Sequence, residues 1–272
     1  MNPVELAFAA LVTATLGSLG GLGGAVLLVP VLVIAGVEPR LAAPLGLISV
    51  AAGSLAAAPR QLTDRVINHR IGVSLEIAAS AAALVGAIVS GVVSERLLSI
   101  VLGVVALAAA VVGARRKGMR NKPDPALTAA DLGERSGTLA GVYPLDDGFV
   151  PYQAKRVPLG LLGMGAAGLI AGLSGVSGGF IKTPVTTEVM HVPVKVAAAT
   201  TTFTVGITSA VALLVFASQG RVVPSDAALV AGASLVGGVI GARLQSVLSP
   251  PVVRLALAGL LAVVGVVLLV RA

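Results

Sequence analysis

The sequence predicts an all-α polytopic membrane protein made of two homologous halves, each with about four membrane helical segments. The chain of 272 residues is 56% hydrophobic and 11% charged, with a mean hydropathy of +1.01, whereas soluble proteins carry about 25% charged residues. Apolar runs long enough to span a bilayer, which takes about 20 residues, recur along the chain. Glycine-rich interruptions of these runs occur at matching places in the two halves.

The internal repeat is visible at one constant offset of 154 residues. Each of four Gly and Pro residues in the first half has a counterpart in the second half: Gly21 and Gly175, Gly24 and Gly178, Pro30 and Pro184, Pro39 and Pro193. Paired apolar segments interrupted by Gly and Pro are typical of secondary transporters that bind substrate between their repeats. The chain is therefore divided into an N-terminal membrane repeat, a linker and a C-terminal membrane repeat, at residues 1–114, 115–156 and 157–272.

The first segment of each half, residues 3–36 and 157–190, is too long for one straight crossing. A helix over residues 3–36 would be about 50 Å long, against a hydrocarbon core of about 30 Å. The glycine-rich break therefore produces either a strongly bent crossing or a re-entrant hairpin of two part-helices, and the length favours the hairpin. Hairpins would make the two repeats inverted, whereas bent crossings would make them parallel. The distribution of Lys and Arg satisfies the positive-inside rule in both cases.

Three crossing helices follow the broken segment in each half. We expect Glu76, Arg60 and Arg243 to be interfacial anchors, because they lie near the ends of these predicted spans. Small residues such as Gly237 and Gly241 allow close helix packing, within one protomer or between two, so the sequence leaves a homodimer open. The predicted spans are residues 40–59, 71–93, 97–114, 195–217, 225–247 and 252–270.

Residues 115–156 form an extended polar stretch between the halves. It contains eight Lys/Arg and five Asp/Glu, so we expect it on the cytoplasmic side of the inner (plasma) membrane. Alternating apolar residues in 138–154 flank Asp146-Asp147-Gly148, and Asp-Gly is a strong hairpin-turn signal. This part is predicted to be a β-hairpin, with a disordered connector as the alternative.

Composition limits the chemistry. The absence of cysteine excludes disulfides and thiolate metal sites, and His69 and His191 are too few for a metal or haem site, so we expect neither a metal nor another cofactor. The basic excess lies beside the spans, which indicates a lipid bilayer and not a nucleic acid as the partner. Residues 172–178 resemble a hydrolase nucleophile elbow but lack its strand–turn–helix context, so the sequence predicts no enzyme.

The glycine-rich breaks are candidate anion-binding elements. Free backbone groups at membrane depth are tolerated only where protein or a water-filled cavity satisfies them. The helix that restarts after each break directs unpaired N–H groups and the positive end of its dipole toward that cavity. The alternative is close helix packing, for which Gly20 and Gly24, and likewise Gly168 and Gly172, have the typical spacing. The predicted ligands at the breaks are Gly21, Gly23, Gly24, Gly175, Ser177, Gly178 and Gly179.

Lys182 follows the second break by three residues, and an ionisable residue inside a membrane segment is a functional hypothesis by default. The alternative is a lysine whose stem reaches the interface. Its counterpart in the first half is Leu28, so a site built on it is asymmetric. We expect Lys182 to hold the charge of an anion, with hydroxyl groups around the anion's oxygens. These hydroxyls belong to Thr183, Thr187, Thr200 and Thr204.

Thr200, Thr204 and Thr208 share one helical face by their spacing. The alternative role of the threonines is to hydrogen-bond their own helices or to join neighbouring helices. Glu188 and His191 close the second broken segment and are candidates for proton coupling, since histidine titrates near neutrality. Their alternative role is to cap a helix end at the interface.

These motifs together resemble the TauE/SafE family of sulfite exporters. The matching features are the breaks with their prolines (residues 20–39 and 172–193), the threonine-rich stretch 197–204, and the Gly-Ala pairs at Gly86 and Gly241. The segment from Leu139 to Tyr152 is similar to a loop in some members. The resemblance covers the chain outside residues 115–135. It implies a permease or exporter of small, often sulfur-containing anions such as sulfite, sulfonates or thiosulfate, in either direction.

The sequence therefore predicts an anion transporter that works by alternating access at a site between the repeats. A permease for a cation or a neutral solute is one alternative, and it needs an inward carboxylate, for which Glu76 and Glu188 are available. A membrane scaffold that transports nothing is the other, although a scaffold has no need of two broken helices.

Overall fold

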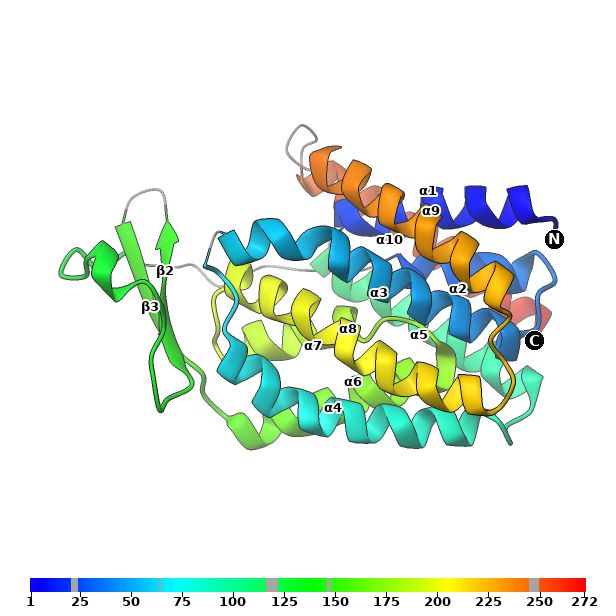
Figure 1. Ribbon diagram of the computed structural model, residues 1–272, viewed down its shortest axis with the longest axis horizontal. Helices are drawn as coiled ribbons and strands as arrows, with labels where there is room; N and C mark the ends of the chain where they lie inside the picture. The colour runs from blue at the N-terminus through cyan, green and yellow to red at the C-terminus, as the bar shows by residue number, and fades with distance from the viewer. Residues whose placement is uncertain (21–23, 64, 116–121, 146–147, 245–249) are drawn as a thin grey trace.

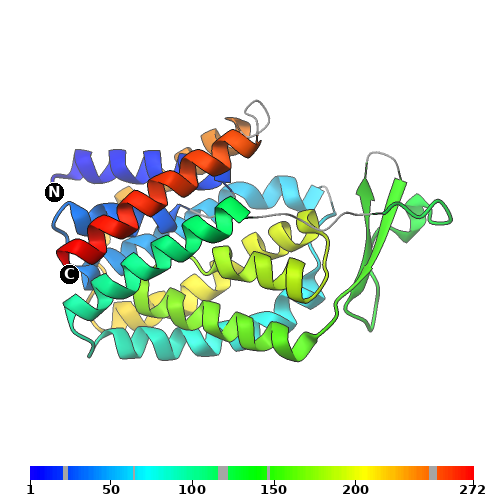
Figure 2. The ribbon, with the colours of Figure 1, turned by 180° about the vertical axis from the view of Figure 1, so that it is seen from behind.

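The computed structural model describes residues 1–20, 24–63, 65–115, 122–145, 148–244 and 250–272. It is a bundle of helices with a small β-sheet at one end (Figure 1). Both chain termini lie at the other end (Figure 2), so we name the two ends the sheet end and the terminal end. Six of the described helices are long and apolar enough to cross a membrane, which confirms the predicted class of all-α polytopic membrane protein.

Each half contains a broken first segment followed by three long helices, as predicted. The first half has α1 (Pro3–Gly20), α2 (Ala25–Ile34), α3 (Pro39–Thr63), α4 (His69–Ser90) and α5 (Glu95–Arg115). The second half has α6 (Val157–Ser174), α7 (Gly179–Pro184) with its π-helical continuation η2 (Val185–Val189), α8 (Val194–Ser218), α9 (Pro224–Leu244) and α10 (Pro250–Arg271). The offset of 154 residues aligns α1 with α6, α2 with α7, and α3 to α5 with α8 to α10.

The second broken segment turns back to the end of the bundle where it began. The N–H of Lys155, just before α6, donates to the carbonyl of Met190, just after η2, over 2.9 Å. The segment 157–190 is therefore a hairpin of two part-helices and does not cross the bundle to the other end.

The first broken segment is also a hairpin. Helix α1 runs beside α9 in the same direction, because Gly237 lies against Leu11 and Gly241 against Thr15. Both α9 and α3 begin at the terminal end (Figure 1), so α1 and α3 start at the same end. The close packing of these two glycines on α1 lies within one protomer.

The two halves consequently have inverted topology, since one hairpin begins at the terminal end and the other at the sheet end. Each hairpin packs mainly on the other half, α1 on α9 and α6 on α4. Where α6 packs on α4, a Cβ on Gly168 would collide with the backbone of Ala79, and a Cβ on Gly172 with that of Ala83. For these two glycines, close helix packing is the correct explanation.

The linker folds into an antiparallel three-stranded sheet in the order β1 (Gly133–Glu134), β2 (Ala140–Leu145) and β3 (Gly148–Gln153), preceded by the turn η1 (Ala129–Asp131). Strands β2 and β3 form the hairpin that the alternation predicts, with Tyr143 opposite Val150, while Asp146 and Asp147 lie outside the described residues. Tyr143 and Val150 pack with Ile71 and other apolar residues of α4, α6 and α8. The sheet thus covers the sheet end of these three helices.

Asn68 joins the sheet to the bundle. Its side chain caps α4 by accepting from the N–H of Ile71 over 2.9 Å. Its Nδ2 donates to the Tyr152 hydroxyl over 3.1 Å and to the Ala140 carbonyl over 3.3 Å. Its own N–H donates to Oγ1 of Thr200 over 3.0 Å. One buried residue therefore links α4, α8 and two strands.

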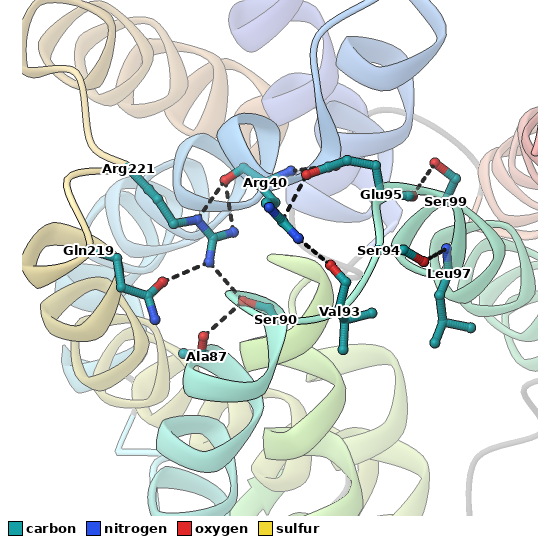
Figure 3. A network of polar contacts seen from close by, with 10 residues as sticks. All are labelled: Arg40, Ala87, Ser90, Val93, Ser94, Glu95, Leu97, Ser99, Gln219 and Arg221. Carbon is teal, nitrogen blue, oxygen red and sulfur yellow. Dashed lines mark hydrogen bonds and ion pairs between the residues drawn. The ribbon is translucent and has the colours of Figure 1, made fainter.

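A polar network holds three connections together at the terminal end (Figure 3). Nε and Nη2 of Arg221, before α9, donate to the carbonyl of Arg40 over 3.0 and 2.8 Å. Nη1 of Arg221 donates to Ser90 at the end of α4 over 2.7 Å. Nε of Arg40 lies 2.8 Å from Oε1 of Glu95 at the start of α5. Burial, and then the neighbouring Arg40, lowers the pKa of Arg221 to about 10.

Candidate functional site

Lys182 lies in α7, just after the second break, and its side chain is 1% exposed. Its Nζ donates to Oε2 of Glu76 over 2.7 Å and to Oγ1 of Thr208 over 2.5 Å. The other carboxylate oxygen of Glu76 accepts from the hydroxyls of Thr208 and Ser80. We name Lys182, Glu76, Thr208 and Ser80 the Lys182 cluster. It joins α7 and α8 of the second half to α4 of the first.

The expectation that Glu76 is an interfacial anchor was wrong. Glu76 is 5% exposed and is hydrogen-bonded inside the bundle. Hydropathy placed it near the start of a span, but hydropathy does not tell which side of the helix faces inward. The partner Lys182 is 106 residues away in the sequence, so local spacing could not reveal the pair. A weak signal was present in Ser80, which lies one turn after Glu76 and shares its face.

A buried ion pair is an expensive way to hold helices together. Burial costs each charge several kcal/mol of hydration free energy, and the attraction between the two charges at best compensates for this cost. The equivalent place in the first half shows that the fold does not require it. There the counterparts of Lys182 and Glu76 are Leu28 and Val230, both fully buried in one apolar cluster. The asymmetry favours a functional role for the Lys182 cluster over a structural one.

Lys182 has a donor to spare. An ammonium group carries three N–H donors, and two of them are used by Glu76 and Thr208. Among the described residues the third has no acceptor. The adjacent Thr183 is 3% exposed, and within the described chain its hydroxyl also has no hydrogen-bond partner. Both groups are thus available to a ligand that brings its own oxygens.

The second break is held in a conformation that requires glycine. Gly175 has a φ of +69°, and a Cβ there would collide with the backbone of Ala43 in α3. The N–H of Gly179 donates to Oγ of Ser177 over 3.1 Å. The N–H groups of Ser177, Gly178 and Phe180 have no acceptor among the described residues, although all three residues are buried. The break therefore presents unpaired donors within the same segment as Lys182.

The threonine stripe lies on one face of α8, as its spacing predicts. Thr200 and Thr204 place their methyl groups 3.2 and 3.0 Å from the position that a Cβ on Gly72 of α4 would take. The Thr200 hydroxyl accepts from Asn68, and the Thr204 hydroxyl donates to the Thr201 carbonyl. Thr187 likewise donates to a carbonyl of its own segment, that of Thr183.

Of the threonines on this face of α8, Thr208 is the one that contacts Lys182 and Glu76. The sequence placed Thr208 on the correct face, but our predicted ligand set did not include it. Its depth in the bundle follows from the pairing of α8 with α4, which runs from Asn68 and Thr200 to Glu76 and Thr208.

At the first break the structure describes Gly24, while Gly21 and Gly23 lie outside the described residues. Gly24 is buried, and a Cβ on it would lie 2.8 Å from Cα of Ala14 and 3.0 Å from Oγ of Ser49. Oγ of Ser49 accepts from Ser234 of α9 over 2.9 Å. Close packing is a sufficient explanation for Gly24.

Glu188 and His191 do not join the Lys182 cluster. Glu188 is exposed and His191 is partly buried, and both lie at the sheet end, next to the contact between Met190 and Lys155. His191 has a φ of +58°, so the chain turns sharply there before α8. Neither side chain forms a hydrogen bond or ion pair with another described residue. The carboxylate beside Lys182 is that of Glu76.

Two inverted halves, each with a re-entrant broken helix, together with a buried charged cluster, are typical of a membrane transporter. The family model of the sulfite exporter TauE/SafE matches residues 6–268. The chain therefore belongs to this family of membrane transporters, which confirms the resemblance seen in the sequence. No curated protein and no solved structure matches the chain at a significant level.

Proposed function

We propose that the protein transports small, sulfur-containing oxyanions such as sulfite or sulfonates across the membrane, and that these anions bind between the two halves beside Lys182. The observation that carries this proposal is the buried Lys182 ammonium, which uses two of its three donors within the described residues. The hydroxyl of Thr183 and the N–H groups of the second break that have no partner in the same part of the chain support it. These groups supply a positive charge and several donors, which is the chemistry that binds the oxygens of a small anion.

The other threonines take different parts in this proposal. Thr208 enters the site, because its hydroxyl already bridges Lys182 and Glu76. Thr187, Thr200 and Thr204 would have to exchange their present hydrogen bonds for bonds to the substrate. We therefore assign them to the wall of the pathway along α8 and not to the first contacts of the anion.

Transport requires that the site open to one side of the membrane at a time. Contacts between the halves are present at both ends of the bundle: the Asn68 contacts at the sheet end and the Arg221 network at the terminal end. In the proposed cycle of alternating access each set breaks in turn. The hydrogen bonds of Arg221 to Arg40 and Ser90 join helices of opposite halves, so their loss would free the terminal end.

We propose that the sheet end is cytoplasmic in the inner membrane. The connections at this end carry most of the Lys and Arg residues of the sequence, which is the distribution of cytoplasmic loops. With an inverted repeat, both termini then lie on the opposite side.

A second candidate function is transport of a cation or a neutral solute. Glu76 provides the inward carboxylate that this function needs, and it favours this candidate more than the sequence alone did. The carboxylate, however, already accepts from Lys182, Thr208 and Ser80. A cation would have to displace the ammonium group from a low-dielectric site, so we rank this candidate below anion transport.

Thermal unfolding of the purified protein with a panel of ligands tests the proposal. The panel contains sulfite, thiosulfate, methanesulfonate, acetate and, for the second candidate, choline. A ligand that binds the folded state stabilises it by mass action. We expect stabilisation by one or more sulfur oxyanions. Stabilisation by choline alone would favour the second candidate, and a flat response to the anions would contradict anion binding.

A further inference from the structure

The Lys182 cluster has no net charge as it stands, and this sets a condition on any anion that enters. Lys182 contributes one positive charge and Glu76 one negative charge, 2.7 Å apart and both buried. An anion added to this pair would give the buried site a net negative charge. Burying an uncompensated charge costs several kcal/mol, so entry of the anion must be accompanied by a compensating change.

We infer that Glu76 binds the compensating proton, so that one proton enters the site with each monoanion. The inference rests on the proposed function, because it concerns the same site. When the Glu76 carboxylate takes up a proton it becomes a neutral carboxylic acid, and the ammonium of Lys182 is free to pair with the anion. The buried charge is zero before the step, with Lys182 and Glu76 ionised. It is zero again afterwards, with Lys182 and the anion paired.

The described side chains around Glu76 offer no other carboxylate to take up this proton. The elements packed against α4 are chiefly α6 and α8. Helix α6 has no titratable side chain, and α8 carries Lys195 alone, which is exposed near its start. The sheet contributes Tyr143 and Tyr152. Burial raises the pKa of both hydroxyls, that of Tyr143 to about 12, so both stay neutral at physiological pH. Lys182 is the charged group that faces the carboxylate.

Three further ionisable residues, His69, Arg70 and Glu134, lie near the start of α4 but outside the Lys182 cluster. Nδ1 of His69 lies 4.0 Å from Oε1 of Glu134 in β1, and Glu134 also accepts from the N–H of Arg70 over 3.1 Å. These groups are exposed or partly exposed at the edge of the bundle. They do not touch the Lys182 cluster.

The hydrogen bonds of the cluster suit both protonation states. The ionised carboxylate accepts from Thr208 and Ser80 on one oxygen and from Lys182 on the other. A hydroxyl group can donate or accept. After protonation, the carboxylic acid O–H of Glu76 can donate a hydrogen bond to Oγ1 of Thr208, and the Thr208 hydroxyl can then donate to an oxygen of the bound anion. Thr208 is therefore placed to pass the change in Glu76 on to the anion.

The experiment measures proton uptake on anion binding. Purified protein in lightly buffered detergent solution is titrated with methanesulfonate, a monoanion that stays fully ionised from mildly acidic to mildly alkaline pH, and a pH-indicator dye reports proton uptake. For the wild type we expect about one proton per bound anion, and an affinity that rises about tenfold for each unit by which the pH is lowered.

Glu76→Gln provides the decisive comparison, because an uncharged amide of the same size imitates the protonated acid. We expect this variant to bind methanesulfonate without proton uptake and with an affinity that no longer depends on pH. Ser234→Ala is the matched control. Ser234 is the buried counterpart of Ser80 at the same offset, and its loss should leave the pH dependence unchanged.

The outcomes separate the inference from the proposed function. Anion binding by the wild type without proton uptake would overturn the inference and leave anion transport standing. Proton uptake that persists in Glu76→Gln would also overturn it, by moving the proton to another group. If methanesulfonate and the other anions of the panel do not bind to the wild type at all, both proposals fail. Should Glu76→Gln not fold, the proton count of the wild type still decides.

Discussion

The most informative perturbation of this structure replaces the Lys182–Glu76 pair by the residues at the equivalent positions of the other half. The first half carries Leu28 and Val230 at the equivalent places, both fully buried. The double variant Lys182→Leu with Glu76→Val therefore gives the second half a pair of side chains that the fold already accommodates. We expect it to fold with a stability equal to that of the wild type or higher, and to lose anion binding.

The single variants should behave very differently. Lys182→Leu leaves the Glu76 carboxylate buried with only the hydroxyls of Thr208 and Ser80 as partners. Removing one partner of a buried pair costs about 3–5 kcal/mol, whereas replacing both partners by apolar residues is often neutral or stabilising. The double variant should thus regain most of the loss caused by either single variant, a coupling of about 3 kcal/mol or more.

The destabilisation of Lys182→Leu should also depend on pH. The isolated carboxylate escapes its penalty by taking up a proton, so the loss of stability should shrink by up to about 1.4 kcal/mol for each unit by which the pH falls. Denaturant unfolding in detergent at several pH values gives the free energy of unfolding of the wild type, of the two single variants and of the double variant. Additive single effects, or a double variant less stable than both singles, would refute the view that the pair is costly to the fold.

Further predictions concern the break, the sheet and the orientation. Gly175→Ala should destabilise the protein by more than about 3 kcal/mol, since the residue has a φ of +69° and a Cβ would strike Ala43, whereas Gly165→Ala, with open space at that position, should stabilise it by up to about 1 kcal/mol. Tyr143→Phe should stabilise the protein by about 1 kcal/mol, because the buried hydroxyl has no partner among the described residues, while Tyr152→Phe should weaken it by a similar amount, because Asn68 loses an acceptor. Since burial raises the pKa of Tyr143 from 10.0 to about 12, the folded state holds this proton more strongly, and the wild type should lose stability as the pH rises through that range; the Phe variant should lack this loss. The chain has no cysteine, so Ser136→Cys and Asn2→Cys should react with an impermeant thiol reagent from opposite sides of the membrane; labelling from one side would contradict the inverted topology.

Much of the architecture was predictable because it depends on local patterns in the sequence. Apolar run lengths predicted the crossing helices, and the constant offset between Gly175, Pro184 and their counterparts predicted the repeat. The length of residues 3–36 favoured a hairpin over a bent crossing, and the structure has the hairpin. The alternation around residues 138–154 predicted β2 and β3, because a strand exposes its period of two in the sequence.

The composition of the site was harder to predict, because it depends on contacts between distant helices. Lys182 was recognisable alone, as a charge within an apolar segment. Its partner Glu76 was not, since the placement of α7 relative to α4 decides which residues of the two helices meet. The register between α4 and α8 brings Thr208 to Glu76 and Thr200 to Asn68. The spacing of the threonines predicted their common face, but it did not predict which threonine contacts Lys182.

The most direct test of the proposed function is uptake of labelled sulfite and methanesulfonate into proteoliposomes, by the wild type and by the double variant Lys182→Leu with Glu76→Val at equal amounts of folded protein. The account predicts uptake by the wild type that saturates with anion concentration and background uptake by the double variant. Equal uptake by both proteins would contradict the assignment of the site to Lys182. Background uptake of both anions by the wild type would contradict the transport of sulfur oxyanions.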